Sequence, residues 1–297
     1  MRMAHRTASL MLLAIGGVTL AGAAPVARLV KATRCDVQDG RIFVPAGSVL
    51  LGEDGAGRPG HKVDVAAFWI DRHEVTNRQF AAFVQATGYR TEAERAGGSA
   101  IFVQPTEPVA LDNAGAWWRY RKGADWRHPL GPGSDIAGRE DLPVIHVDYA
   151  DASAYAHWSG GALPDEAQWE RAARGDQTVA RDPRSWAYEG DSHPVANSWQ
   201  GVFPVRDTGG DGYVGLAPVG CFPANSFGLR DMVGNVWEWT RGQREGSGLI
   251  KGGSYLCAMN YCANFRPAAF QAQERDLGTS HIGFRTIRPA SIATLGA

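Results

Sequence analysis

Glycine makes up an unusually large share of this chain. There are 37 glycines and ten tryptophans among 297 residues, and a usual glycine share is roughly 7%. Glycine destabilises helix interiors by about 1 kcal/mol relative to alanine, which disfavours a helical bundle. Disordered chains contain few large apolar rings, so the tryptophan content excludes disorder. Composition therefore predicts a loop-rich globular protein that is held together by aromatic packing.

Charge and cysteine content exclude two further classes of protein. The 30 Lys and Arg residues balance 31 Asp and Glu residues, for a net charge of −1, whereas nucleic-acid binding requires a clustered basic excess. The four cysteines are Cys35, Cys221, Cys257 and Cys262. A chain of this length can bury a sizeable core without disulfides, so it is no disulfide scaffold.

The first 24 residues have the pattern of a secretory signal peptide. A basic start without acidic residues precedes an apolar run over 10–23, and small residues follow it. We expect cleavage near Ala23 or Ala24 and export to the periplasm or the extracellular space. An uncleaved signal anchor is the alternative, although the run is short for a span of about 20 residues. No later run suits a membrane span, and we expect residues 25–40 to form a linker.

The remaining sequence indicates short elements within one domain, over residues 41–290, and a tail over 291–297. Alternating patterns predict strands over 41–51 and 61–70. Helices are predicted from Thr76 to Gly88, over 148–158, and from Pro164 to Gly175. The stretch 96–142 is expected to be a long irregular loop, of the kind that is functional or forms a packed arm.

Two cysteines follow a pair of glycines in the segment Gly252-Gly253-Ser254-Tyr255-Leu256-Cys257, with Cys262 five residues later. In an exported protein a local disulfide is one interpretation. The other is a soft-metal site, since two thiolates select Cu(I) or Zn and closed zinc sites normally use four ligands. Two protein thiolates leave room for a third sulfur from a substrate, and Ser254 offers a hydroxyl beside them.

A run rich in oxygen ligands extends from Asn197 to Glu238. It combines glycine turns with Asp, Asn and Glu side chains, which are the hard oxygen donors that calcium prefers. The spacing does not fit a twelve-residue EF-hand loop. Ordinary Asp-Gly turns are the alternative interpretation.

Histidines are scattered along the chain, without an HExxH or comparable spacing. His146 and His157 flank apolar positions and are interpreted as packing or surface residues. The sequence also contains no GxSxG, P-loop or GxGxxG motif before a helix.

Taken together, many segments resemble the formylglycine-generating enzymes, also called sulfatase-modifying factors. The resemblance covers nearly all of residues 41–288 in consistent order. Its most specific element is GGSYLC-x4-C, which catalytically silent paralogues and the related iron-dependent sulfoxide synthases lack. The other matching segments include FWIDRHEVTNRQFAAFV, LPVIHVDYADASAYAHWSG, LPDEAQWERAARG, NSFGLRDMVGNVWEWT and TSHIGFR.

This resemblance implies a fold, a reaction and a partner. The fold would be a compact α+β arrangement related to C-type lectins, with little regular secondary structure. Cys257 and Cys262 would bind Cu(I), and Ser254 would line the pocket for oxygen or the substrate thiol. The substrate would be a cysteine within a CxPxR segment of an unfolded sulfatase, which molecular oxygen converts to formylglycine. We expect the protein to act as a monomer.

The resemblance also implies two structural calcium sites. Asn197, the carbonyl of Ser198, Asp211 and the carbonyl of Tyr213 would form the first. Asp231, the carbonyls of Gly234 and Val236, and Glu238 would form the second. Glu74, in the matching HEVTN element, is a weaker candidate ligand.

Some positions depart from the family pattern. The cysteines of two disulfides found in animal members are replaced, at Ala156, Ala172, Pro267 and Thr286. Phe270 stands where the family usually has an arginine, which raises the question of target choice. Cys35 and Cys221 have no family counterpart, and they would either bridge distant residues or remain single thiols.

These departures keep two other functions open. The protein would be an oxidase of the same scaffold that acts on another thiol, or a non-catalytic binding paralogue in which Cys257 and Cys262 form a disulfide.

Overall fold

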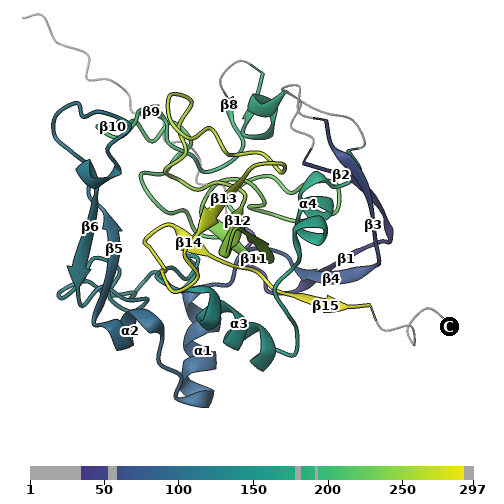
Figure 1. The fold of residues 1–297 in the computed structure, drawn as a ribbon, viewed down its shortest axis with the longest axis horizontal. Coiled ribbons are helices and arrows are strands. Elements are labelled where there is room, and N and C mark those ends of the chain that lie inside the picture. Colours follow the sequence, from purple (N-terminus) through teal and green to yellow (C-terminus); the bar gives the residue numbers. More distant parts are fainter. Residues whose placement is uncertain (1–34, 53–58, 178–181, 191–192, 291–297) are drawn as a thin grey trace, which may run out of the picture. The chain divides into compact units, whose positions relative to one another are not determined.

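The computed structural model describes residues 35–52, 59–177, 182–190 and 193–290. The expected signal peptide, most of the expected linker and the expected tail lie outside the described residues. The described part mixes short helices with small sheets (Figure 1), which confirms the α+β expectation of little regular secondary structure. The helices are α1 (Asn77–Thr87), α2 (Glu92–Ala96), α3 (Tyr149–Trp158) and α4 (Glu166–Arg174), with 3-10 turns η1 (Ala114–Ala116) and η2 (Pro183–Trp186).

Each α-helix begins at a capping box, in which the cap side chain and a side chain three residues later satisfy each other's backbone N–H groups. In α1, Thr76 Oγ1 accepts from the Gln79 N–H while the Gln79 side chain accepts from the Thr76 N–H. The same device caps α2, α3 and α4. Gly88 then ends α1 in the left-handed conformation, which glycine adopts without strain. The three predicted helices are therefore confirmed, and α2 is additional.

Among the described residues, two sheets contain more than two strands. A three-stranded sheet has the order β1-β4-β15, and a four-stranded sheet has the order β13-β12-β11-β14. Their strands are β1 (Arg41–Val44), β4 (Phe68–Asp71), β11 (Trp237–Arg244), β12 (Ser247–Lys251), β13 (Phe270–Gln273), β14 (Ile282–Gly283) and β15 (Ile287–Pro289). The four-stranded sheet matters most for function, because its strands lead into and out of the Cys257–Cys262 segment.

Four two-stranded ribbons complete the strands: β2 (Gly47–Leu51) with β3 (His61–Val65), β5 (Gly98–Phe102) with β6 (Trp118–Lys122), β7 (Tyr188–Glu189) with β8 (His193–Pro194), and β9 (Gly201–Val202) with β10 (Arg206–Asp207). The predicted strands 41–51 and 61–70 are each broken into two. Short breaks let β1 and β4 pair within one sheet while β2 and β3 form a separate ribbon.

The irregular loop expected over 96–142 was wrong in part, since this stretch contains the β5–β6 ribbon. Gly98 pairs with Lys122 and Phe102 with Trp118 in an antiparallel register. The connection between the two strands is too long to show the tight-turn signal of a hairpin. The stretch is nevertheless packed, because Trp117 and Trp126 are each 1% exposed.

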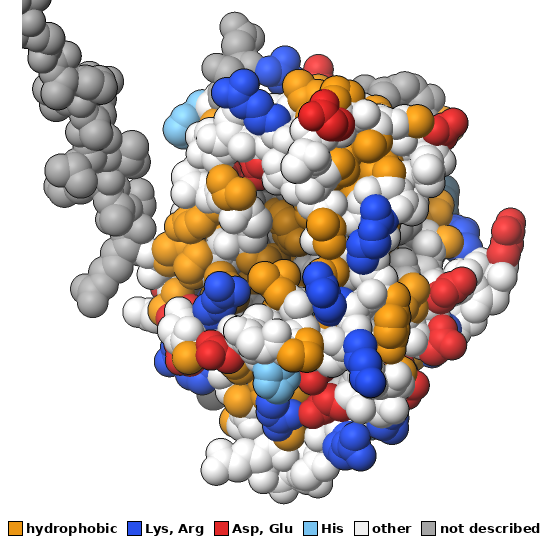
Figure 2. Space-filling model, turned by 90° about the vertical axis from the view of Figure 1, so that its left-hand side faces the viewer, with side chains coloured by type: hydrophobic (Ala, Val, Ile, Leu, Met, Phe, Trp, Pro, Cys, Tyr) orange, Lys and Arg blue, Asp and Glu red, His pale blue; other side chains and the backbone are white. Residues whose placement is uncertain are grey.

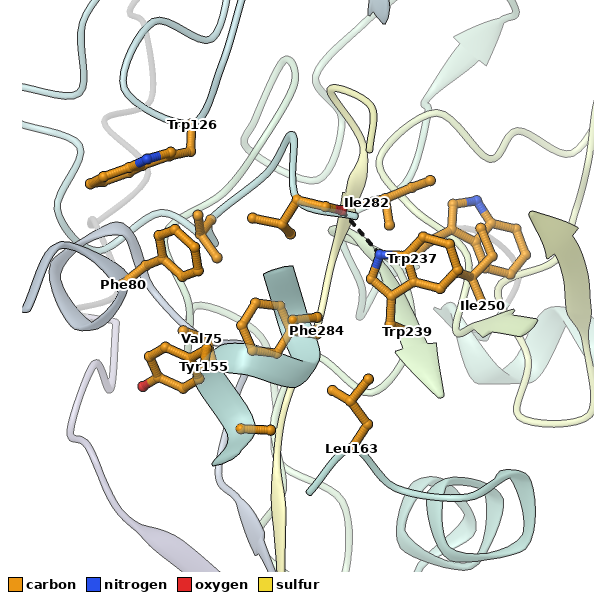
Figure 3. Close-up of a cluster of buried hydrophobic side chains, with 14 of the residues drawn as sticks. Val75, Phe80, Trp126, Tyr155, Leu163, Trp237, Trp239, Ile250, Ile282 and Phe284 are labelled. Carbon is orange, nitrogen blue, oxygen red and sulfur yellow. Dashed lines mark hydrogen bonds between the residues drawn. The ribbon is translucent and has the colours of Figure 1, made fainter. Parts of the chain in front are cut away.

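Aromatic side chains dominate the core. Figure 3 shows Phe80 of α1 beside Tyr155 of α3 and Phe284, and the ring centroids of Tyr155 and Phe284 lie 5.3 Å apart. The dashed line in Figure 3 is the hydrogen bond that the Trp239 indole N–H donates to the Val147 carbonyl, at 3.0 Å. Large aromatic side chains are therefore a substantial part of the buried apolar core.

The open question about the two remaining cysteines is resolved by the structure. Cys35 and Cys221 form a disulfide across 186 residues. Next to it, Asp36 pairs with Arg72 and Arg230, at 2.9 and 3.3 Å. The first described residues are therefore fixed to the loop before Asp231. Among the described residues, no helix has the length and hydrophobicity that crossing a bilayer requires.

Candidate active site

Cys257 and Cys262 lie on one tight turn that follows β12. Both are free thiols, Cys257 buried and Cys262 half-buried. The turn is closed by reciprocal backbone hydrogen bonds between Ala258 and Tyr261. The structure thus brings the two predicted sulfurs together, without a disulfide bond between them.

Unusual backbone conformations shape this turn. Cys262 and Ala263 have φ values of 72° and 45°, a region that non-glycine residues rarely occupy and that is often found at functional sites. Gly253 has a φ of 77°, and a Cβ there would meet the backbone of Asn264 and Phe265 at 3.1 Å. Glycine is therefore required where the chain before the turn passes the chain after it.

The two thiols differ in acidity. The Cys262 sulfur accepts a hydrogen bond from the Cys257 thiol, and this lowers the pKa of Cys262. Burial, followed by the interaction with Cys262, raises the pKa of Cys257 well above its usual value. A soft cation binds thiolates, so two adjacent sulfurs with one already acidified would fit a soft cation such as Cu(I).

A cavity of about 450 Å³ opens beside the turn. Figure 2 shows hydrophobic side chains gathered around a hollow near the middle of one face of the molecule. Within the part of the chain that the structure describes, no Asp, Glu, Lys or Arg lines the cavity. Its wall consists of the two cysteines, Ser254, and a set of aromatic, aliphatic and uncharged polar residues. That set is Ala100, Trp117, Trp118, Phe203, Trp237, Leu256, Tyr261, Asn264, Gln271, Gln273, Leu277, Thr279 and His281.

Ser254 lies on the wall of this cavity. It is fully buried and lines the cavity with both cysteines. Its hydroxyl oxygen accepts from the Leu256 N–H at 3.2 Å, and its carbonyl accepts from the Cys257 N–H at 2.9 Å. Ser254 therefore fixes the first cysteine and also keeps a hydroxyl at the wall.

His281 supplies a neutral imidazole to the cavity. Its Nδ1 lies 2.6 Å from Thr279 Oγ1, and its ring packs on Trp118 with centroids 4.8 Å apart. Burial, and then the nearby His146, lower the pKa of His281 to about 3. At neutral pH this imidazole is therefore a hydrogen-bonding group and not a charge.

Asn235 connects the cysteine turn to the oxygen-rich segments. Its Oδ1 accepts from Asn197 Nδ2 and the Ala217 N–H, and its carbonyl accepts from the Tyr255 N–H. Its backbone adopts a left-handed φ of 55°. One residue thus joins the predicted calcium region to the motif that contains Cys257.

The first predicted calcium set is partly assembled. Asp211 accepts from the backbone N–H groups of Ser198 and Tyr213, both at 3.0 Å. Burial raises the pKa of Asp211 to about 6. A cation would relieve this cost, so the half-buried carboxylate of Asp211 fits calcium. Asn197 directly precedes Ser198 in the chain. Its side-chain Nδ2 donates hydrogen bonds to the Gly215 carbonyl and to Asn235 Oδ1.

The second predicted set is organised around Arg285. This guanidinium donates to both carboxylate oxygens of Glu238, and also to the Asp231 carbonyl at 3.0 Å. Trp169 Nε1 donates to Glu238 Oε2 as well, at 2.7 Å. Glu238 Oε2 therefore already accepts two bonds, which leaves only Oε1 with room for a further partner.

Glu74 lies in this second set with both carboxylate oxygens buried and without a hydrogen-bond partner. Burial, and then the charges of Asp231 and Glu238, raise the pKa of Glu74 well above its usual value. A bound cation would satisfy orphaned oxygens of this kind, and the role of Glu74 as a ligand stays a prediction. Across the described ranges, no three His, Cys, Asp or Glu side chains are arranged to hold a metal ion, so any such site would depend on the carbonyls of Gly234 and Val236.

Several residues of the cavity wall could not be predicted from the sequence. Gln271, Gln273 and Asn264 line the wall, but single amides carry no motif. Trp117 and Trp118 belong to the stretch 96–142, in which no motif marks single residues. Asn235 gave a weak signal through its place between Gly234 and Val236.

Comparisons with known proteins agree with this geometry. The family described as "Sulfatase-modifying factor enzyme 1-like domain" matches residues 26–290. The chain is 42% identical to a formylglycine-generating enzyme of Mycobacterium tuberculosis, covering 83% of this chain and 96% of that protein. It is 43% identical to one of Thermomonospora curvata, covering 84% and 93%.

A solved structure shares the fold at lower identity. The structure of PvdO from Pseudomonas aeruginosa matches with a TM-score of 0.59 and 24% identity, covering 86% of this chain and 96% of that one. Because the family match and the two relatives each span most of the chain, the protein belongs to the family of sulfatase-modifying factor enzymes.

Proposed function

We propose that this protein oxidises a cysteine of an unfolded sulfatase to formylglycine, with Cu(I) and molecular oxygen. The observation that carries the proposal is the pair of free thiols, Cys257 and Cys262, on the wall of an uncharged cavity. The relatives named formylglycine-generating enzymes support the same reaction class.

The residues of this chain would divide the work as follows. Cys257 and Cys262 would hold the copper, which supplies oxygen activation when bound. Ser254 would present its hydroxyl to the bound oxygen or to the substrate thiol. The aromatic wall, including Trp117 and Trp118, would exclude water, and the absence of charged lining among the described residues suits a thiol and an oxygen molecule.

The net reaction needs a reductant. A cysteine, one oxygen molecule, two electrons and two protons give formylglycine, hydrogen sulfide and water. A thiol reductant supplies the electrons in the assay.

We further propose that the protein is exported and that calcium stabilises it. The Cys35–Cys221 disulfide supports an oxidising compartment. The half-buried carboxylate of Asp211 and the buried carboxylate of Glu74 support calcium at the two oxygen-rich sets.

The test is peptide oxidation by reduced, copper-loaded protein under air, with a CxPxR peptide and aldehyde labelling. Wild type should form the aldehyde, and Cys257→Ser and Cys262→Ser should each lose at least about a hundredfold in rate, since they remove a metal ligand. Met259→Ala is the matched control, because Met259 is an exposed residue of the same turn.

Other outcomes would redirect the proposal. Full activity in Cys262→Ser would refute the role of the thiol pair. Turnover of a different thiol in place of the CxPxR peptide would favour the second oxidase function. A Cys257–Cys262 disulfide that resists mild reductant, together with no copper uptake, would favour the binding paralogue.

A further inference from the structure

The four-stranded sheet has an unpaired edge at the active-site cavity. Strand β13 (Phe270–Gln273) pairs with β12 on one side and ends the sheet on the other. Within the described residues, no backbone hydrogen bond joins the outer side of β13 to another segment. The N–H and C=O groups along this edge are therefore available to a further strand.

The two faces of β13 have different surroundings. Gln271 and Gln273 line the cavity together with Cys257 and Cys262. Phe270 has the Arg244 guanidinium 5.1 Å above its ring centroid. Side chains alternate along a strand, so the cavity lies on the face of Gln271 and Gln273.

The sequence of β13 leaves this edge unprotected. Proteins usually blunt edge strands with charges, prolines or bulges. The residues of β13, Phe-Gln-Ala-Gln, include neither a charge nor a proline, and their pairing with β12 is regular. A short, neutral and open edge beside a reactive pair of thiols is suited to transient pairing with a peptide.

We propose that the substrate polypeptide binds as an added β-strand along the free edge of β13, so that its cysteine side chain enters the cavity. This inference rests on the proposed function and deepens it, because it identifies how the backbone of an unfolded client is held. Main-chain pairing gives affinity with little dependence on side chains, which suits an enzyme whose cavity offers no charged side chain among the described residues.

The substrate motif determines which of its backbone groups face β13. N–H groups of alternate residues in a strand point to the same side, so the cysteine and the proline two positions later in CxPxR share one orientation. Proline has no N–H to donate. Pairing therefore keeps all its hydrogen bonds when the backbone groups of the cysteine and the proline point away from β13. The residue directly after the cysteine then donates its N–H to the edge. The cysteine and proline side chains share the cavity face.

The experiment replaces single peptide bonds by esters in a CxPxR peptide, and measures aldehyde formation by wild-type, copper-loaded protein. Removing the N–H of the residue after the cysteine should raise KM about 3- to 10-fold with kcat within twofold, as expected for one hydrogen bond made equally in the ground and transition states. Removing the N–H of the cysteine itself should change KM less than twofold, and this peptide is the matched control.

A second measurement is independent of catalysis. Binding of the peptide in which serine replaces the cysteine should slow amide hydrogen exchange in residues 270–273, and leave the β15 edge of the other sheet unchanged. If the unmodified peptide is not oxidised, the proposed function fails. If it is oxidised but the ester replacements leave KM unchanged, the strand-addition proposal is overturned and the proposed function stands. The same holds if residues 270–273 gain no protection from amide hydrogen exchange.

Discussion

Arg285 and Glu238 form a buried, two-pronged ion pair. The Arg285 Nη2 and Nε donate to the two carboxylate oxygens of Glu238 at 2.7 and 2.8 Å, and both residues are at most 1% exposed. Glu74 and Asp231 lie close enough to interact electrostatically with the same guanidinium. Arg285 therefore offsets the negative charge of three buried acidic residues, Glu238, Glu74 and Asp231.

Replacing this cation should destabilise the protein strongly. Arg285→Met leaves the buried carboxylate of Glu238 without its charged partner, and breaking a buried pair in this way costs about 3–5 kcal/mol. Arg241→Met is the control, since Arg241 pairs at the surface with Asp165 and exposed pairs contribute about 0–1 kcal/mol. Urea unfolding followed by tryptophan fluorescence measures both. Equal losses would contradict the assignment.

Calcium should stabilise the protein through Asp211. A ligand that binds only the folded state raises its melting temperature, so excess chelator should lower it. Asp211→Asn should reduce this dependence, because it removes the carboxylate charge that would attract the ion. Asp207→Asn, in the same loop but outside the predicted ligand set, should keep the full calcium response. A chelator-insensitive wild type would argue against calcium.

The two buried histidines, His146 and His281, should each contribute a loss of stability as the pH falls below 7, whereas carboxyl groups with a raised pKa, such as Asp211, contribute in the opposite direction. Burial lowers the pKa of His281 to about 3 and that of His146 to about 4, against about 6.5 when unfolded. At these two residues the unfolded chain therefore binds more protons than the folded one as the pH falls from about 6.5, and their contribution to stability is lost. Each imidazole contributes a loss of about 2 kcal/mol between pH 7 and pH 5.

His281→Asn tests this pH dependence, because asparagine keeps a polar amide and does not titrate. Between pH 7 and pH 5 its unfolding free energy should fall by about 2 kcal/mol less than that of wild type, because the His281 contribution is removed. An unchanged slope would mean that His281 does not remain neutral in the folded protein. His157→Asn is the control, since His157 is exposed.

Removing the disulfide should cost stability without touching the thiol pair. The double variant Cys35→Ala, Cys221→Ala loses a bridge across 186 residues, and native disulfides typically contribute about 2–4 kcal/mol. Copper uptake by Cys257 and Cys262 should persist. Loss of copper binding in this variant, at a temperature where it is folded, would contradict the separation of the two roles.

Gly253→Ala should disturb the cysteine turn. The added Cβ would lie 3.1 Å from backbone atoms of Asn264 and Phe265 at a φ of 77°. Gly246→Ala is a close match, because Gly246 has a φ of 84° but nothing within 4 Å of the added Cβ. Both variants carry the cost of positive φ, about 1 kcal/mol. Only Gly253→Ala should lose copper affinity as well, and equal copper affinity would refute the steric argument.

The sequence determined the local devices of this protein. Helix boundaries followed from capping side chains such as Thr76 with Gln79, and from Gly88, because these act over three or four residues. The spacing of Cys257 and Cys262 placed both sulfurs on one short turn for the same reason.

Tertiary structure decided everything that depends on residues distant in the chain. It joined Cys35 to Cys221, set Arg285 against Glu238, and lined one cavity with Trp118, Gln271 and Cys262. None of these contacts has a local signal, since each depends on how irregular segments pack around buried aromatic rings. The glycine-rich composition predicted such a fold, but only packing determined which side chains surround the thiols.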